Sequence, residues 1–155
     1  RSMSIKLWAA ALAVVTLTGC ASVQLGDKTV EAELKQFKPV AGKTSLYVCR
    51  EPAMLVAAGV TTQVMVDGRD IGAVKPNMFV HALVEPGTHG VGMRNDGIAG
   101  TSSPWISIQT QAGEVAFLWI GVTGKGFGTY TIDHFESPQK GRDCVTGAAY
   151  SVKAN

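Results

Sequence analysis

Hydrophobic and polar residues follow three successive patterns along this chain. Residues 7–18 form an almost unbroken apolar run, whereas residues 21–43 are mostly polar. After Lys43, apolar residues recur at every second position in several short segments. Because successive side chains of a β-strand point to opposite faces, this period of two predicts a domain built from half-buried strands.

Four segments carry the strand pattern most clearly, at residues 46–49, 64–67, 106–109 and 115–122. Apolar and other residues alternate in the first three. The last, VAFLWIGV, is apolar over nearly its whole length, which is typical of a strand covered on both faces. Short strands separated by turn residues predict an all-β domain, either an antiparallel β-sandwich or a small barrel.

Turn signals divide residues 64–93, which read VMVDGRDIGAVKPNMFVHALVEPGTHGVGM. Asp67-Gly68 is a two-residue hairpin signal, because both residues adopt positive φ at low cost. Glu85-Pro86-Gly87-Thr88 is a second reversal, in which proline fixes φ and glycine supplies a positive φ. We therefore expect a meander of four strands here.

The apolar run lies behind Met3 and Lys6 and ends just before Cys20. A helix of its length rises roughly 18 Å, against a hydrocarbon core of roughly 30 Å, which favours a secretory signal over a membrane-spanning helix. A buried core helix is the alternative. Leu17-Thr18-Gly19-Cys20 resembles the bacterial lipobox, in which signal peptidase II cuts before the cysteine and the thiol carries a diacylglyceryl group.

The lipobox resemblance sets the expected organisation of the chain. Residues 1–19 are the signal peptide, with Arg1 and Ser2 as a cloning remnant, and Cys20 carries the acyl chains, the only cofactor expected. Residues 20–43 form a tether in which TVEAELKQF (29–37) makes one or two helical turns, and residues 44–155 form the β-sandwich. No aspartate follows Cys20, and in the lipoprotein sorting pattern this favours the outer membrane, facing the periplasm. The inner membrane and the cell surface stay open.

Composition and charge narrow the classes of partner. Hydrophobic residues make up 46% and charged residues 17% of the chain, as in a folded domain rather than a disordered one. Removing Arg1 and Lys6 from the 14 basic residues leaves 12, equal to the 12 acidic residues. A balanced mature chain has no basic surface for a phosphate backbone, so we expect no nucleic-acid partner.

Two cysteines remain besides Cys20, at positions 49 and 144. An exported domain meets an oxidising compartment, which permits a disulfide between them. Closing so long a loop contributes about 4 to 5 kcal/mol in the chain-entropy model. Two buried free thiols are the alternative. No histidine or further cysteine accompanies either residue at ligand spacing, so we expect no metal site.

The strand and turn motifs, in their order behind the lipobox, resemble the DUF2846 family of bacterial lipoproteins and, more loosely, PEGA-type surface modules. The matching motifs are Tyr47-Val48-Cys49-Arg50, Val66-Asp67-Gly68 with Ile71-Gly72, Glu85-Pro86-Gly87-Thr88-His89, and Gln111-Ala112-Gly113-Glu114. The resemblance covers roughly residues 37–143 and implies an immunoglobulin-like or related antiparallel β-sandwich, with no assigned reaction. Cys49 stands where an aromatic residue is expected, which favours a disulfide peculiar to this protein.

Signals for catalysis are weak. Residues 121–128, GVTGKGFG, lack the first glycine and the Ser or Thr of a phosphate-binding P-loop. A hydrolase would have to combine Ser102 or Ser103 with Asp133 and His134, but adjacent residues of one strand point to opposite faces. His81 shares the strand parity of Phe79, which favours a structural histidine. The sequence therefore predicts no enzyme, and no metal shared by the histidines.

A binding role fits the sequence better. Residues 95–104 form a long polar segment and residues 123–128 a glycine-rich tip, and recognition usually lies in such loops. We expect four aromatic residues to lie in the core, namely Trp105, Phe117, Trp119 and Tyr130. The prediction is a membrane-anchored, non-catalytic envelope module with a protein or cell-wall partner; the alternative is a small-molecule or metal binder. The expected contact residues are Asn95, Asp96, Thr101, Ser102, Lys125 and Phe127.

Overall fold

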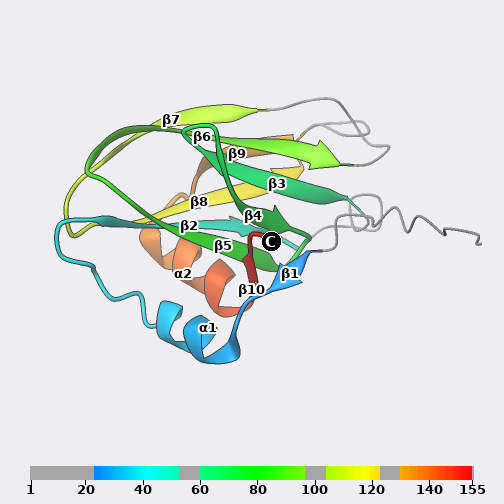
Figure 1. Ribbon diagram of the computed structural model, residues 1–155, viewed down its shortest axis with the longest axis horizontal. Helices are drawn as coiled ribbons and strands as arrows, with labels where there is room; N and C mark the ends of the chain where they lie inside the picture. Colours follow the sequence, from blue (N-terminus) through cyan, green and yellow to red (C-terminus); the bar gives the residue numbers. More distant parts are fainter. Residues whose placement is uncertain (1–22, 53–59, 97–103, 123–129, 155) are drawn as a thin grey trace, which may run out of the picture.

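The structure is a computed structural model that describes residues 23–52, 60–96, 104–122 and 130–154. These residues form two β-sheets packed face to face, with two short helices on the outer face of the larger sheet (Figure 1). The prediction of an all-β sandwich is confirmed. The helices add a third, partial layer.

The larger sheet has six strands in the order β1-β10-β5-β2-β8-β9. They are β1 (Gln24–Leu25), β2 (Thr44–Arg50), β5 (Met78–Val84), β8 (Val115–Val122), β9 (Tyr130–His134) and β10 (Ala149–Val152). The pairs β2 with β8 and β10 with β5 are parallel. This sheet is therefore mixed, not antiparallel as expected. Parallel neighbours need a long crossover, and the chain between β2 and β8 supplies one by forming the second sheet.

The smaller sheet has four antiparallel strands in the order β4-β3-β6-β7. They are β3 (Thr61–Val66), β4 (Arg69–Val74), β6 (Gly87–Asp96) and β7 (Trp105–Thr110). As expected, Asp67 and Gly68 form the β3–β4 hairpin turn, with φ angles of 50° and 77°. The glycine of the second reversal, Gly87, also has a positive φ, of 134°.

The expected four-stranded meander is wrong in its second half. β5 crosses to the larger sheet, where it lies between β10 and β2, and β6 returns to pair with β3. The burial of β5 explains this. Its consecutive residues Phe79 and Val80 are both fully buried, which requires cover on both faces of the strand. Only the larger sheet offers that, because it lies between the smaller sheet and the helices.

The two helices are α1 (Lys28–Leu34) and α2 (Pro138–Thr146). Asp27 caps α1 by accepting hydrogen bonds from the backbone N–H groups of Thr29 and Val30. The short helix expected within residues 29–37 is therefore present. Helix α2 was not expected, although its ends carry ordinary helix signals: Ser137 and Pro138 at the start and Gly147 at the end.

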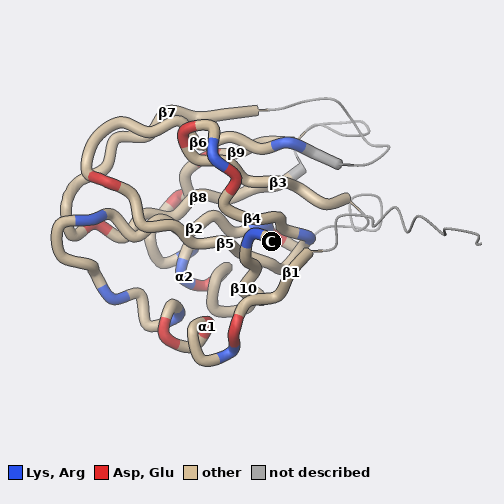
Figure 2. The backbone as a smooth tube through the Cα atoms, in the orientation of Figure 1, with Lys and Arg blue, Asp and Glu red and all other residues tan. Residues whose placement is uncertain are grey.

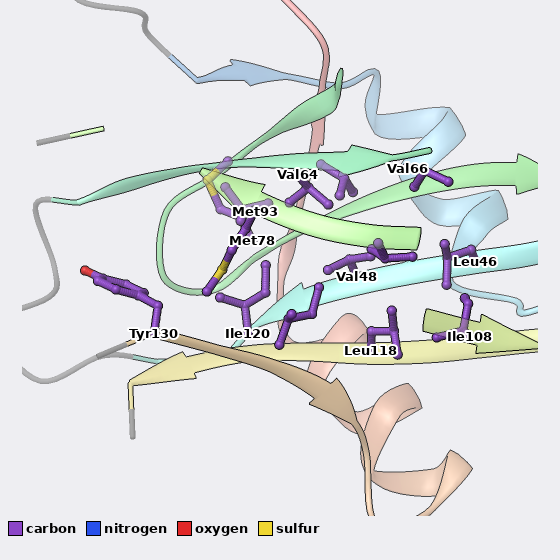
Figure 3. Close-up of a cluster of buried hydrophobic side chains, with 14 of the residues drawn as sticks. Leu46, Val48, Val64, Val66, Met78, Met93, Ile108, Leu118, Ile120 and Tyr130 are labelled. Carbon is purple, nitrogen blue, oxygen red and sulfur yellow. The ribbon is translucent and has the colours of Figure 1, made fainter. Parts of the chain in front are cut away.

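Strand β2 lies at the centre of the protein, and all seven of its residues are buried. Leu46 and Val48 face the main core between the two sheets (Figure 3). Tyr47 and Cys49 face a second core, under the helices, to which Phe117 contributes. Half-burial, the expectation for this strand, is thus replaced by burial on both faces.

The segment expected to be a tether belongs to the folded body from Val23 onward. Val23 packs against the main core, and β1 pairs with β10. Helix α1 is held on the larger sheet by Tyr47, whose hydroxyl donates a hydrogen bond of 2.6 Å to the carbonyl of Leu34. Within the described part of the chain, no helix has the length and apolar character needed to cross a membrane.

The two sides of the sandwich are closed by different strands. On one side β4 lies against β5 and β10, and on the other β7 approaches β9. Strands β1 and β7 therefore lie at opposite sides of the domain, as Figure 1 shows, with β7 at the top and β1 beside the helices at the bottom.

Candidate binding surface

The described helices pack on the larger sheet, which leaves the outer face of the smaller sheet without a covering helix (Figure 1). Its inner face is defined by buried residues such as Val64, Val91 and Ile108. Strand alternation then places Met65, Gly92 and Trp105 on the outer face. The pairing register aligns these three residues in one row, because Gly92 lies opposite both Met65 on β3 and Trp105 on β7.

Trp105 is the most exposed large apolar residue of this part of the chain, with 72% of its surface accessible. Two glycines of the neighbouring strand β6, Gly90 and Gly92, contribute no side chain to this face. A side chain at Gly90 would point into open space, and one at Gly92 would come within 3.2 Å of Cβ of Trp105. The indole thus lies directly beside Gly92 of β6, which carries no side chain.

The expectation that four aromatic residues lie in the core holds for two of them. Phe117 and Tyr130 are buried, whereas Trp119 is half-buried and its indole N–H donates to the carbonyl of His134. Trp105 is wrong. Because Ile106 and Ile108 of the same strand point inward, Trp105 must point outward, and the alternation in WISIQT carries that signal.

Four of the six predicted contact residues lie outside the described residues, namely Thr101, Ser102, Lys125 and Phe127. The lipobox residues Leu17, Thr18, Gly19 and Cys20 also lie outside them. Asn95 and Asp96 end strand β6, where their backbones lie opposite Thr62 and Thr61. Trp105, at the start of the next strand, is the exposed residue that the loop-based prediction missed.

The structure joins Cys49 and Cys144 in a disulfide, with their Cα atoms 6.3 Å apart. The bridge ties helix α2 to the central strand β2 inside the second core. Gly141 makes the close approach of this helix possible, because a Cβ there would lie 2.4 Å from Cγ of Phe117.

Arg50, the last residue of the Tyr47-Val48-Cys49-Arg50 motif, is a buried cation between the sheets. Its Nη1 donates to the carbonyls of Val60 and Val74, and its guanidinium lies 5.6 Å from the ring centroid of Tyr130. Burial lowers the pKa of Arg50. The residue supports the fold by joining β2 to the ends of β3 and β4.

The three histidines lie apart and do not form a shared site. His81 is on β5, His89 on β6, and His134 at the end of β9. Nε2 of His81 lies 2.6 Å from Oγ of Ser45, the spacing of a nucleophile and its base. However, burial lowers the pKa of His81 to about 4, which makes it a weak base, and its described hydrogen bonds include no carboxylate.

No metal centre is evident in the described residues. They contain no group of three or more His, Cys, Asp or Glu side chains that would hold a metal ion. A cavity of about 170 Å³ beside α2 is lined partly by Glu114, Phe117 and His134. Charged residues of both signs are interleaved along the described backbone (Figure 2).

Comparison with known families agrees with these motifs. The family model described as a protein of unknown function, DUF2846, matches residues 40–124, more than half of the chain. The chain belongs to the DUF2846 family. No curated protein matches it.

The DUF2846 match runs from just before β2 to just after β8. It therefore contains the whole smaller sheet, with Met65, Gly92 and Trp105. Helix α2 and Cys144 follow the matched region, and β1 and α1 precede it. The disulfide thus joins a residue of the family region to one outside it.

Proposed function

We propose that this DUF2846 protein is a non-catalytic binding module of the bacterial envelope. A lipid on Cys20 anchors it in the outer membrane, facing the periplasm, and the outer face of its smaller sheet binds a protein partner. The exposure of Trp105 on an open sheet face carries the proposal. Tryptophan is enriched among the residues that dominate protein–protein binding energy.

The shape of the surface favours a protein over a small molecule. Small ligands are held in concave sites of about 300 to 1,000 Å³, whereas Met65, Gly92 and Trp105 lie along one row of a sheet. The 170 Å³ cavity beside α2 is below that range and lies elsewhere. The Cys49–Cys144 disulfide supports an exported location, because such bridges persist in oxidising compartments.

The test is crosslinking in cells that express the native gene product, with mass analysis of the membrane-extracted chain. We expect cleavage before Cys20, added acyl groups, and a recurrent crosslinked protein. Trp105→Ala should reduce recovery of that protein roughly 30-fold, the effect of losing about 2 kcal/mol at a binding hot spot. Leu83→Ala is the matched control, because Leu83 is also exposed but lies on β5.

Two results would overturn the proposal. An unprocessed mass would remove the anchor, and equal crosslinking by Trp105→Ala and the parent would remove the binding surface. Recovery of the chain with cell-wall glycan instead of protein would replace the protein partner with a saccharide that stacks on Trp105.

A further inference from the structure

The point at which the chain enters the folded body limits how far the domain stands from its anchor. Only Ala21 and Ser22 separate Cys20 from Val23, which packs against the main core. Three Cα–Cα steps span at most roughly 11 Å. The headgroup layer of one leaflet is about 5 to 8 Å thick, so a lipidated Cys20 holds β1 close to the headgroups.

The surface next to this point carries exposed apolar side chains. The described residues include four large apolar residues that are exposed, and two of them, Leu25 on β1 and Val30 on α1, lie within ten positions of Cys20. Leu25 is 58% exposed and Val30 is 41% exposed. Lys28, between them in sequence, has 76% of its side chain exposed. The Lys28 ammonium lies 3.3 Å from a carboxylate oxygen of Glu31, so the apolar side chains of Leu25 and Val30 are what suits this surface to a membrane interface.

The local geometry holds this surface in place. The N–H of Gly26 donates to the carbonyl of Tyr150, and a Cβ at Gly26 would overlap the Tyr150 ring, so the β1–α1 junction lies tightly on β10. Glu31 accepts a hydrogen bond from the backbone N–H of Tyr150 and one from Lys35. Leu25 and Val30 are therefore presented from a fixed junction.

We propose that β1 and the first turn of α1 rest on the phospholipid headgroup layer, with Leu25 and Val30 inserted at its surface. The inference rests on the proposed lipidation of Cys20. It sets the orientation of the domain, because Trp105 on β7 lies at the side opposite β1. The membrane then covers the β1 side, and the binding surface stays accessible in the periplasm.

The test attaches residues 20–155, which include every described residue, to vesicles by a chemical link. With Cys49 and Cys144 bridged, Cys20 is the remaining thiol of the three cysteines and reacts with a maleimide phospholipid. The vesicles contain phosphatidylethanolamine, phosphatidylglycerol and brominated lipid, which quenches tryptophan at the membrane surface. We expect Leu25→Trp to gain a fluorescence component quenched several-fold more strongly than the one that Leu83→Trp gains. Equal quenching would overturn the proposal.

A second measurement uses the unsubstituted chain. Amide hydrogen exchange of residues 23–34 should slow several-fold on coupling to vesicles, whereas exchange of residues 104–110 should not change. Uniform slowing of exchange, or no slowing in residues 23–34, would contradict the proposed contact of β1 and α1 with the headgroup layer. Because the link is chemical, these results do not depend on processing in cells. An unprocessed native chain would refute the anchor separately.

Discussion

Asp67 and His89 join two turns at one end of the sandwich. Nδ1 of His89 lies 2.6 Å from Oδ2 of Asp67, and the other carboxylate oxygen accepts a 2.9 Å hydrogen bond from the N–H of Gly90. Nε2 of His89 lies 2.5 Å from the carbonyl of Glu85 in the second turn. The β3–β4 hairpin is thereby tied to the connection between the two sheets.

Asp67→Asn should weaken this link while keeping a residue that tolerates positive φ. The hydrogen bond from His89 lowers the pKa of Asp67, so its stabilisation is present above the ordinary carboxyl pKa of 3.8 and is lost as pH falls. We expect a loss of about 1 kcal/mol in the free energy of unfolding at pH 7. Urea denaturation at pH 7 and at acidic pH should show the two proteins converging in acid. A difference independent of pH would refute the role of the charge.

His81 should make the domain less stable in mild acid. Burial lowers its pKa from 6.5 to about 4, so between these values the unfolded chain binds a proton that the folded chain does not. The free energy of unfolding therefore falls as pH drops through this window, by up to about 3 kcal/mol. His81→Gln should flatten the pH profile measured by denaturation, because the variant has no imidazole at this position to take up the proton. Equal slopes in the variant and the parent would contradict this assignment.

The disulfide should contribute much of the stability. Replacing both cysteines, Cys49→Ser with Cys144→Ser, is expected to lower the free energy of unfolding by about 4 kcal/mol, because the bridge restricts a long loop in the unfolded chain. Urea melts with and without reductant give the measurement. Reductant should lower the stability of the parent and not that of the double variant. Alkylation of either cysteine in the native, unreduced protein would refute the bridge.

Arg50→Met should destabilise the sandwich by about 2 to 4 kcal/mol. The methionine has similar length but cannot donate to the carbonyls of Val60 and Val74, which would remain buried without this donor. The exposed Arg69→Met on β4 is the control and should change stability by less than about 0.5 kcal/mol. Thermal melts compare the two, and equal small effects would show that Arg50 is dispensable.

The sequence predicted local structure better than it predicted which strands become neighbours. Alternation located β2, a continuous apolar run located β8, and the Asp67-Gly68 turn follows from backbone chemistry alone. The crossing of β5 to the larger sheet depends on cover from helices far away in sequence, so no local pattern contains it. Helix α2 was missed because its short run, PQKGRDCVT, contributes only two buried residues.

For the candidate surface, too, local strand patterns were available in the sequence, whereas the pairing between strands was not. Trp105 was assigned to the core on residue type, although the alternation of its own strand places it outside. Its alignment with Met65 and Gly92 required the pairing of β3, β6 and β7, which single strands do not reveal. The pairing of Cys49 with Cys144 likewise depended on how α2 packs on β2.

The pairing of β1 with β10 also constrains the order of folding. Gln24 lies opposite Val152, so β1 lacks its partner until residues 149–152 are available. Helix α1 depends on the same end of the chain, because Lys35 donates to the carbonyl of Ala148. Contacts between such distant residues are slow to form. A chain that emerges from its N-terminus, whether during synthesis or during passage through a membrane pore, therefore completes this edge of the domain only once residues 148–152 have emerged.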